Sequence, residues 1–177
     1  DALSSLWETD VAATAFAAAP EFSPPAMKAR LTDGVRFHRE LGLKRDRARF
    51  NSGVLVMNLA HWRRSQLALR AFTYLRVLGD DVLWYEQEAL NVVARDEYRE
   101  LDPRWNVPSQ WAAKWPHDHV SIVHYLTARK PWHWDYAWAE GSRFFAALDQ
   151  TPWAGWRPSR PQFGLARRLM GSLTKAL

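Results

Sequence analysis

A histidine at the end of an apolar run is the first residue whose type and position could do chemistry. His124 follows the largely apolar stretch 120–123 and precedes a polar loop that contains Arg129 and Lys130. In α/β proteins, ligands bind in the crevice beyond the strand ends, where an imidazole can coordinate a metal. A metal and an ammonium group together would neutralise the charge on a departing diphosphate. His124 is therefore a candidate metal ligand, with a purely structural histidine as the alternative.

Polar side chains at the start of a predicted helix form a second candidate. Glu86, Gln87 and Glu88 open this helix, and the side chain of Glu86 or Gln87 could bind sugar hydroxyls. Acids in a first helical turn are also stabilised by the helix dipole, by about 0.3–1 kcal/mol, whether or not they bind a ligand. Asn51 stands just before the best predicted strand, where it could line a site or form the turn into the strand.

Aromatic residues alternate near the end of the chain. Trp132, Trp134, Tyr136 and Trp138 occupy every second position, which is typical of a strand with one exposed face. Sugar rings stack on exposed indoles, but a chain with 11 tryptophans must bury most of them. We predict packing roles for this group, with Trp132 as the one exception.

The elements that must position these residues alternate between strands and helices. Short apolar runs predict buried strands at 11–15, 53–59 and 120–125, and the run at 53–59 is the strongest. Predicted helices lie between the second and third of these strands. This order favours an α/β layered fold over a helical bundle or a β-sandwich.

The predicted helices are separated by segments that contain many prolines. Apolar residues at three-residue steps predict a helix that Ser65 caps and Gly79 ends, and a second helix opens near Glu86. Residues 22–49 and 101–115 lack such periodicity, which predicts loops.

Composition narrows the classes of protein. A chain of 177 residues with 47% apolar content can fill the core of one domain, and it has no apolar run of transmembrane length. The absence of cysteine excludes disulfides, thiolate metal sites and cysteine nucleophiles. A net charge of +5 favours anionic partners, namely phosphate groups, anionic lipids or nucleic acid. We disfavour nucleic acid because the basic residues concentrate in the tail and form no known binding motif.

The tail, residues 151–177, differs from the rest in composition, because basic residues alternate there with aromatic and aliphatic ones. On a helix, Leu165, Leu169 and Leu173 would share one side, away from most of the arginines. We predict a basic amphipathic tail that contacts an anionic membrane surface, to which each basic residue would contribute about 1 kcal/mol. A solvated tail is the alternative.

Four short blocks carry a resemblance to a known family. They are residues 50–59 (FNSGVLVMNL) followed by Trp62, residues 86–91 (EQEALN), residues 101–107 (LDPRWNV), and His124-Tyr125 followed by residues 130–133 (KPWH). In this order and spacing they are similar to the family 8 glycosyltransferases, which include bacterial lipopolysaccharide glucosyl- and galactosyltransferases and the glycogenins. The likeness covers residues 1–148, and residues 3–7 resemble the stretch just after the family's Asp-x-Asp motif.

The resemblance implies a partial GT-A fold, with a mixed sheet flanked by helices, in which residues 1–150 are the C-terminal part of the catalytic domain. It implies transfer of a hexose from a UDP-sugar, with manganese and with retention of configuration, to a saccharide or glycolipid acceptor. The implied location is cytoplasmic, with peripheral contact to the inner membrane through the tail.

The resemblance also implies roles for individual residues. His124 would be a protein ligand to manganese, and Lys130 would contact the donor diphosphate. Gln87 would be the amide beneath the anomeric carbon, and Asn51 and Glu86 would bind donor or acceptor hydroxyls. Trp132 would be a further substrate contact.

The chain departs from the family pattern in ways that bear on activity. Glu86 and Glu88 replace aspartates and are each one methylene longer, which would change their reach toward a sugar. Thr127 replaces a loop glycine, so a Cβ stands where a phosphate would approach the backbone. The Asp-x-Asp motif is expected in a segment ahead of Asp1, and a single histidine cannot hold a hard cation. This chain alone is therefore expected to be inactive, and a noncatalytic sugar-binding remnant of the fold is the alternative.

Overall fold

The structure is a computed structural model that describes residues 2–23, 27–44, 48–113, 115 and 120–160. Its contacts divide the chain into two compact units, residues 1–124 and residues 125–177. No helix within the described residues is long and apolar enough to span a bilayer.

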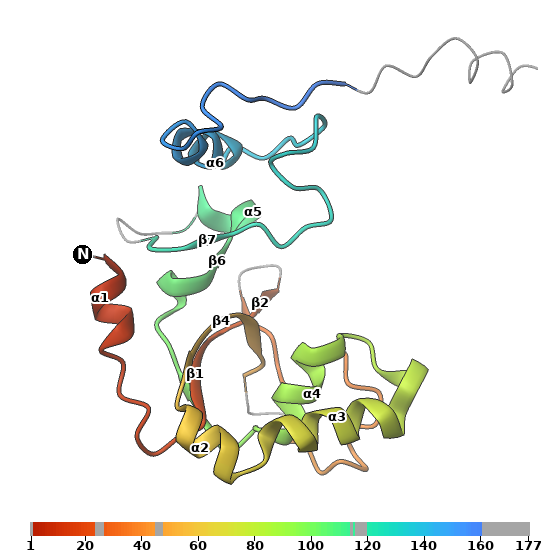
Figure 1. Ribbon diagram of the computed structural model, residues 1–177. Helices are drawn as coiled ribbons and strands as arrows, with labels where there is room; N and C mark the ends of the chain where they lie inside the picture. Colours follow the sequence, from red (N-terminus) through yellow and green to blue (C-terminus); the bar gives the residue numbers. More distant parts are fainter. Residues whose placement is uncertain (1, 24–26, 45–47, 114, 116–119, 161–177) are drawn as a thin grey trace, which may run out of the picture. The chain divides into compact units, whose positions relative to one another are not determined.

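A mixed three-stranded sheet forms the centre of the first unit (Figure 1). Strand β1 (Phe16–Pro20) lies between β4 (Phe50–Met57), which is antiparallel to it, and β5 (Tyr98–Glu100), which is parallel to it. Every residue of β1 is buried, as expected for a middle strand covered on both faces. The mixed sheet and its helices confirm the predicted α/β fold.

The two faces of β1 belong to different parts of the core. Phe16 packs with Phe50 at a ring-centroid distance of 5.2 Å, in a cluster that also contains Leu67 and Leu90 from the helices. Ala17 and Ala19 of β1 point the other way, toward a cluster that includes Trp105. Alternation along one strand therefore joins the helical layer to the segment that follows β5.

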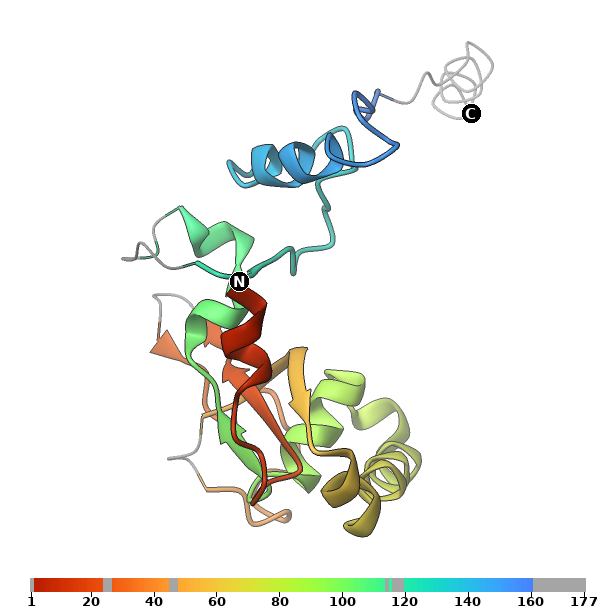
Figure 2. The same ribbon diagram turned by 60° about the vertical axis from the view of Figure 1, so that its left-hand side comes forward.

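Three helices cover one side of the sheet, as both Figure 1 and Figure 2 show. They are α2 (Leu59–Arg64), α3 (Leu67–Leu78) and α4 (Tyr85–Val93). The predicted helix near Glu86 is confirmed as α4.

The predicted N-cap at Ser65 is wrong, because two helices meet there. Asn58 caps α2, with its side chain accepting from the His61 N–H at 3.0 Å, and Ser65 ends that helix. Gln66 then adopts a left-handed conformation, with φ of 52°, before α3 begins. Serine and asparagine both favour caps, so local sequence alone does not separate the two positions.

The predicted strands need correction. The strand predicted at 53–59 is β4, but it ends at Met57, and its residues 53–57 are half-buried or exposed because β4 lies at the edge of the sheet. Residues 11–14 form a turn closed by the Thr14 N–H and the Val11 carbonyl at 3.1 Å, so the first strand begins only at Phe16. The strand predicted at 120–125 is reduced to β7 (Val123–His124). The backbone N–H groups just before β7 both donate to one carbonyl, that of residue 104, instead of forming a ladder.

Short elements complete the first unit. They are α1 (Ala2–Trp7), β2 (Phe22–Ser23), β3 (Met27–Lys28), η1 (Gly79–Asp81), η2 (Pro103–Asn106), β6 (Val107–Pro108) and α5 (Ser109–Ala112). β6 and β7 pair in parallel, with Pro108 opposite His124. The segments predicted as loops at 22–49 and 101–115 thus contain several of these short pieces.

The described part of the second unit consists of turns and one helix, α6 (Gly141–Leu148). The alternating aromatic residues at 132–138 do not form a strand: the His133 N–H donates to the Lys130 carbonyl at 2.8 Å, and the Tyr136 N–H to the His133 carbonyl at 3.1 Å. Trp134 and Trp138 are about as exposed as Trp132, so the prediction that Trp132 is the one exception to burial is wrong. The predicted boundary at residue 150 and the predicted amphipathic tail stay predictions, because residues 161–177 lie outside the described residues.

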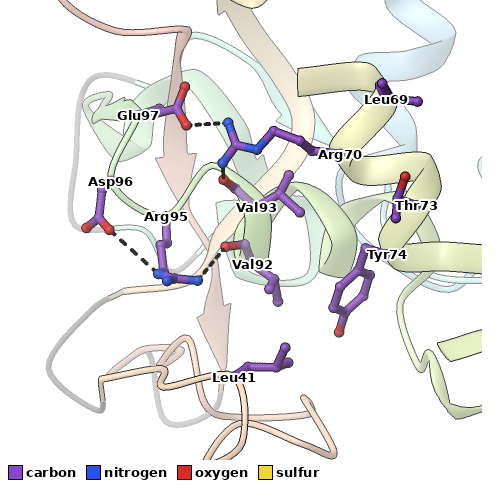
Figure 3. Close-up of a pocket in the computed structure, with 10 residues that line it drawn as sticks. All are labelled: Leu41, Leu69, Arg70, Thr73, Tyr74, Val92, Val93, Arg95, Asp96 and Glu97. Carbon is purple, nitrogen blue, oxygen red and sulfur yellow. Dashed lines mark hydrogen bonds and ion pairs between the residues drawn. The ribbon is translucent and has the colours of Figure 1, made fainter. Parts of the chain in front are cut away.

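Glu97 connects the helices to the start of β5. Its carboxylate accepts from Arg70 of α3 and lies 3.3 Å from the imidazole Nε2 of His61 of α2. Figure 3 shows Arg70 extended across to Glu97 and to the Val93 carbonyl, on the wall of a 530 Å³ cavity. Partial burial opposes ionisation of Glu97, but the hydrogen bond and charge of Arg70 outweigh it and lower the pKa of the carboxyl.

Replacing this carboxylate should destabilise the protein in a pH-dependent way. At pH 7 we expect Glu97→Gln to lower the free energy of unfolding by about 1–2 kcal/mol, because a charge-assisted bond to Arg70 is lost. A folded-state pKa below the unfolded value means that this contribution is complete above the unfolded pKa, about 4.3, and is lost as the pH falls through the folded pKa. Urea unfolding from pH 7 to pH 3 measures the difference.

The matched control for this experiment is Asp96→Asn. The Asp96 side chain is 71% exposed, so its replacement should change stability by no more than about 0.5 kcal/mol. A Glu97→Gln protein as stable as the wild type at pH 7 would contradict the assignment.

Candidate functional site

One buried amide fixes helix α4 against strand β4. The Asn91 side chain accepts from the Phe50 backbone N–H at 3.0 Å and donates to the Phe50 carbonyl at 2.9 Å, as a neighbouring strand would. It also donates to the Gln87 carbonyl, one turn earlier in α4, at 2.8 Å. Because Asn51 follows Phe50 and Gln87 shares this bond, the two candidate residues are brought face to face.

The Gln87 side-chain amide has a defined orientation. Its Nε2 donates to the Glu21 carboxylate at 2.9 Å, and its Oε1 accepts from the Ser52 backbone N–H at 3.2 Å. Glu21 is in turn held by Arg49, whose Nε donates to the same carboxylate oxygen at 2.7 Å. An ionised carboxylate only accepts and a backbone N–H only donates, so the two ends of the glutamine amide cannot be exchanged.

Two asparagines continue the hydrogen-bonded chain from Gln87 to His124. The Asn51 Nδ2 donates to the Gln87 Oε1 at 2.9 Å, and its Oδ1 accepts from the Gly53 N–H at 2.9 Å and from the Asn106 Nδ2 at 2.8 Å. Asn106 therefore presents its own Oδ1 to the His124 Nδ1, 2.7 Å away. We call this chain of side chains, Glu21, Gln87, Asn51, Asn106 and His124, the amide relay.

The amide relay determines the tautomer of His124. Since the Asn106 Oδ1 accepts, the imidazole must carry its proton on Nδ1, and its lone pair then lies on Nε2. Histidines that bind metals commonly donate their other ring N–H to a protein oxygen, which orients the ring. The geometry thus suits His124 to coordinate or accept through Nε2.

Gly53 makes room for the imidazole. A Cβ at this position would lie 2.6 Å from the His124 Nδ1, and still closer to Cε1. It would also lie 2.8 Å from the Asn51 Oδ1. Neither group can move without breaking the amide relay, so glycine at residue 53 is a packing requirement of the site.

Glu86, Gln87 and Glu88 at the start of α4 lie in different environments. Tyr85 has φ of 45°, a strained conformation for a residue with a side chain, immediately before Glu86 and Gln87. Glu86 is exposed at the surface beside Gln87. Glu88 is buried, and its carboxylate accepts from the Tyr74 hydroxyl at 2.7 Å and from the backbone N–H groups of residues 83 and 84 at 2.8 and 3.1 Å.

The longer acid at position 88 therefore secures the helix start from inside. Burial, together with the hydrogen bond and charge of Glu88, raises the pKa of the Tyr74 phenol. Glu88 thus belongs to the protein interior, whereas Glu86 and Gln87 face outward or into the amide relay.

Lys130 and Trp132 belong to the second unit. The Lys130 ammonium donates to the Tyr125 carbonyl, five residues earlier, which leaves it two further N–H groups for a ligand. Trp132 is 48% exposed and packs against Phe144, with ring centroids 5.7 Å apart. The Thr127 hydroxyl, at the position of the expected glycine, donates to the Arg129 carbonyl at 2.6 Å and closes a turn.

The described residues do not by themselves make a metal centre. No group of three His, Asp or Glu side chains within them could enclose an ion, so His124 offers one ligand position only. A hard cation such as manganese needs several oxygen ligands. The chemistry of the His124 Nε2 fits such a role, but the complete ligand set is not found in this part of the chain.

The sequence predicts Asn51, Gln87 and His124 as separate candidates, but it gives no role to Asn106 or Glu21. Asn106 lies within one of the resembling blocks, and its amide supplies the link that joins the other residues. Glu21 directly follows β1, and the position after a strand end was the available signal for it.

The amide relay predicts a specific histidine tautomer. Long-range ¹H–¹⁵N NMR spectra of the His124 ring should show the proton on Nδ1. Asn106→Leu removes the acceptor, so the proton should redistribute between the two nitrogens, and stability should fall by about 1–3 kcal/mol because the Asn51 oxygen loses a buried donor. A wild-type ring protonated on Nε2 alone would contradict the proposed orientation of the amides.

The close approach of Gly53 to the imidazole predicts a coupled pair of substitutions. Gly53→Ala should cost about 1–3 kcal/mol, because the new methyl overlaps the His124 ring. In a His124→Ala background part of this cost should vanish, since the ring is gone while the close approach to the Asn51 Oδ1 remains. A double-mutant cycle by chemical denaturation measures the coupling, and equal costs in both backgrounds would disprove the contact.

Comparison with known proteins shows to which family the chain belongs. The chain is 23% identical to General stress protein A of Bacillus subtilis over 169 residues, which cover 85% of this chain and 55% of that protein. It is 27% identical to the lipopolysaccharide glucosyltransferase WaaO of Escherichia coli over 116 residues, 59% of this chain and 34% of the relative. The chain thus spans about half, or less, of the length of these relatives.

Solved structures share the fold. The galactosyltransferase LgtC in complex with donor and acceptor sugar analogs matches with a TM-score of 0.64 at 22% identity, covering 92% of this chain and 59% of that one. An active-site mutant of LgtC, with glutamine replaced by glutamate, matches with a TM-score of 0.65 at 21% identity, with the same coverage. Residues 1–135, most of the chain, match the family description "Glycosyl transferase family 8". By this match the chain belongs to glycosyl transferase family 8.

Proposed function

We propose that this chain supplies part of the active site of a retaining hexosyltransferase, which moves a sugar from a UDP-hexose to a saccharide or glycolipid acceptor. The observation that carries the proposal is the amide relay, because it aligns the Gln87 amide and the His124 imidazole in one hydrogen-bonded chain. Preorganised dipoles of this kind stabilise a transition state without reorganising during the reaction.

Gln87 and Asn51 would hold the donor sugar. The Gln87 Oε1 already accepts from Asn51 and from the Ser52 backbone, so it is poorly suited to attack the sugar as a nucleophile. Its Nε2 uses one N–H on Glu21 and has a second to offer a sugar hydroxyl. The role that follows is a neutral, rigid dipole beside the anomeric carbon, with the exposed Glu86 available to a hydroxyl at the rim.

His124 and Lys130 would act on the diphosphate side. His124 would hold one position of a manganese ion through Nε2, and the remaining ligands would come from the Asp-x-Asp motif predicted outside this sequence. When bound, such an ion would neutralise charge on the departing UDP. Lys130 would add a positive charge with its remaining N–H groups. Membrane contact through residues 151–177 and a cytoplasmic location are also part of the proposal.

The decisive substitution is Gln87→Ala. In a polypeptide that carries this sequence behind the N-terminal part of its family domain, the variant should lose about 100-fold or more in kcat for transfer from UDP-glucose or UDP-galactose, as when one preorganised donor is removed from an active site. The measurement is UDP release with manganese present, together with the anomeric configuration of the product by NMR.

Gln150→Ala is the matched control. Gln150 is an exposed amide whose side chain only donates to the Ala146 carbonyl, so turnover should not change. Full turnover in Gln87→Ala would refute the catalytic role. If the polypeptide without substitutions binds a sugar but transfers none from either donor, the noncatalytic remnant is favoured instead.

A further inference from the structure

The second unit contains a cavity of 430 Å³ that combines indole rings with polar groups. Its walls include Trp132, Trp134, Trp156, Arg129, His133 and Asp135. All of these residues lie between positions 129 and 159, so the cavity is formed by the second unit alone. The amide relay uses none of them.

The indole rings around this cavity are partly exposed, and two of them contact neighbouring side chains. Trp132, Trp134 and Trp156 are 48%, 46% and 42% exposed. Trp132 packs against Phe144, and the Arg160 guanidinium lies 5.2 Å from the centre of the Trp134 ring. Rigid half-exposed rings lose little conformational entropy when a ligand stacks on them, and the apolar area that a ligand covers favours binding.

The polar groups supply both donors and acceptors. The Arg129 Nε lies 3.2 Å from the Asp135 Oδ2, so the arginine charge is already neutralised. The Asp135 Oδ1 is shielded from solvent and has no hydrogen-bond partner within the described part of the chain. The His133 Nδ1 accepts from the Lys130 backbone N–H at 3.2 Å, which leaves the proton on Nε2 as a donor.

We propose that this cavity is a saccharide-binding subsite for a neutral pyranose ring. A pyranose has apolar C–H faces that stack on indole and a rim of hydroxyls that each need a donor or an acceptor, and the cavity offers both kinds of surface. A phosphate or a nucleotide fits less well, because the Arg129 charge is paired with Asp135. That the bound sugar is the acceptor rests on the proposed glycosyl transfer, whereas the binding itself does not.

Saccharide binding to this cavity can be measured without a UDP-sugar and without glycosyl transfer. Maltose, cellobiose and lactose are each titrated with the 177-residue chain, and saturation-transfer difference NMR reports on the sugar protons. We expect saturable binding of at least one disaccharide, with Kd on the order of 1 mM, and a Kd about tenfold higher or more in Trp134→Ala and in Trp156→Ala. Asp135→Asn should weaken binding as well, because an acceptor is exchanged in part for a donor.

Trp153→Ala is the matched control, because Trp153 is 68% exposed but does not line the cavity. It should bind as the wild type does, and Trp156→Phe should recover much of the binding lost in Trp156→Ala. Thermal unfolding of each variant excludes a loss of fold as the cause.

No saturable binding to any of the three disaccharides, or equal weakening in Trp153→Ala and Trp156→Ala, would overturn the proposal. Full turnover in Gln87→Ala with saccharide binding intact would refute only the proposed catalytic role. Active transfer with no binding at this cavity refutes only the subsite.

Discussion

The pairing of one buried asparagine with one strand residue is the constraint on which the candidate site depends. Asn91 satisfies both backbone groups of Phe50 at the edge of β4, where an unmatched N–H or carbonyl would be costly to bury. The same side chain reaches the Gln87 carbonyl. Helix and strand are thus joined where Asn51 and Gln87 project, and any shift of α4 along β4 would break these bonds together.

The amide relay, which begins beside Asn91, fixes which side of each amide donates and which accepts. The Glu21 carboxylate at one end can only accept, and each amide between Gln87 and Asn106 uses its donor toward one neighbour and its acceptor toward the other. Partly buried polar groups carry a large penalty if one partner is wrong, so such a chain has a single favoured arrangement. The tautomer of His124 is therefore determined by a carboxylate several side chains away.

Local sequence predicted the elements whose signals are contained within a few residues. The apolar run around residue 54 and the helix near Glu86 were found because their pattern does not depend on distant contacts. Ser65 and Asn58 both favour helix N-caps, so the local sequence does not show that Asn58 begins a helix and Ser65 ends it. The tryptophans near residue 134 alternate, yet the turn hydrogen bonds there, and the packing of Trp132 on Phe144, override the strand pattern.

The sequence by itself determined the α/β class, the family resemblance and the candidates Asn51, Gln87 and His124, since residue types and their order are enough for these. Only the tertiary structure decided that Asn106 and Glu21 complete the relay, that Gly53 must lack a side chain, and that Glu88 faces inward. The physical reason is that hydrogen-bond direction and steric overlap depend on atoms far apart in the chain, such as those of Gly53 and His124, which are 71 residues apart. No local pattern records such distances.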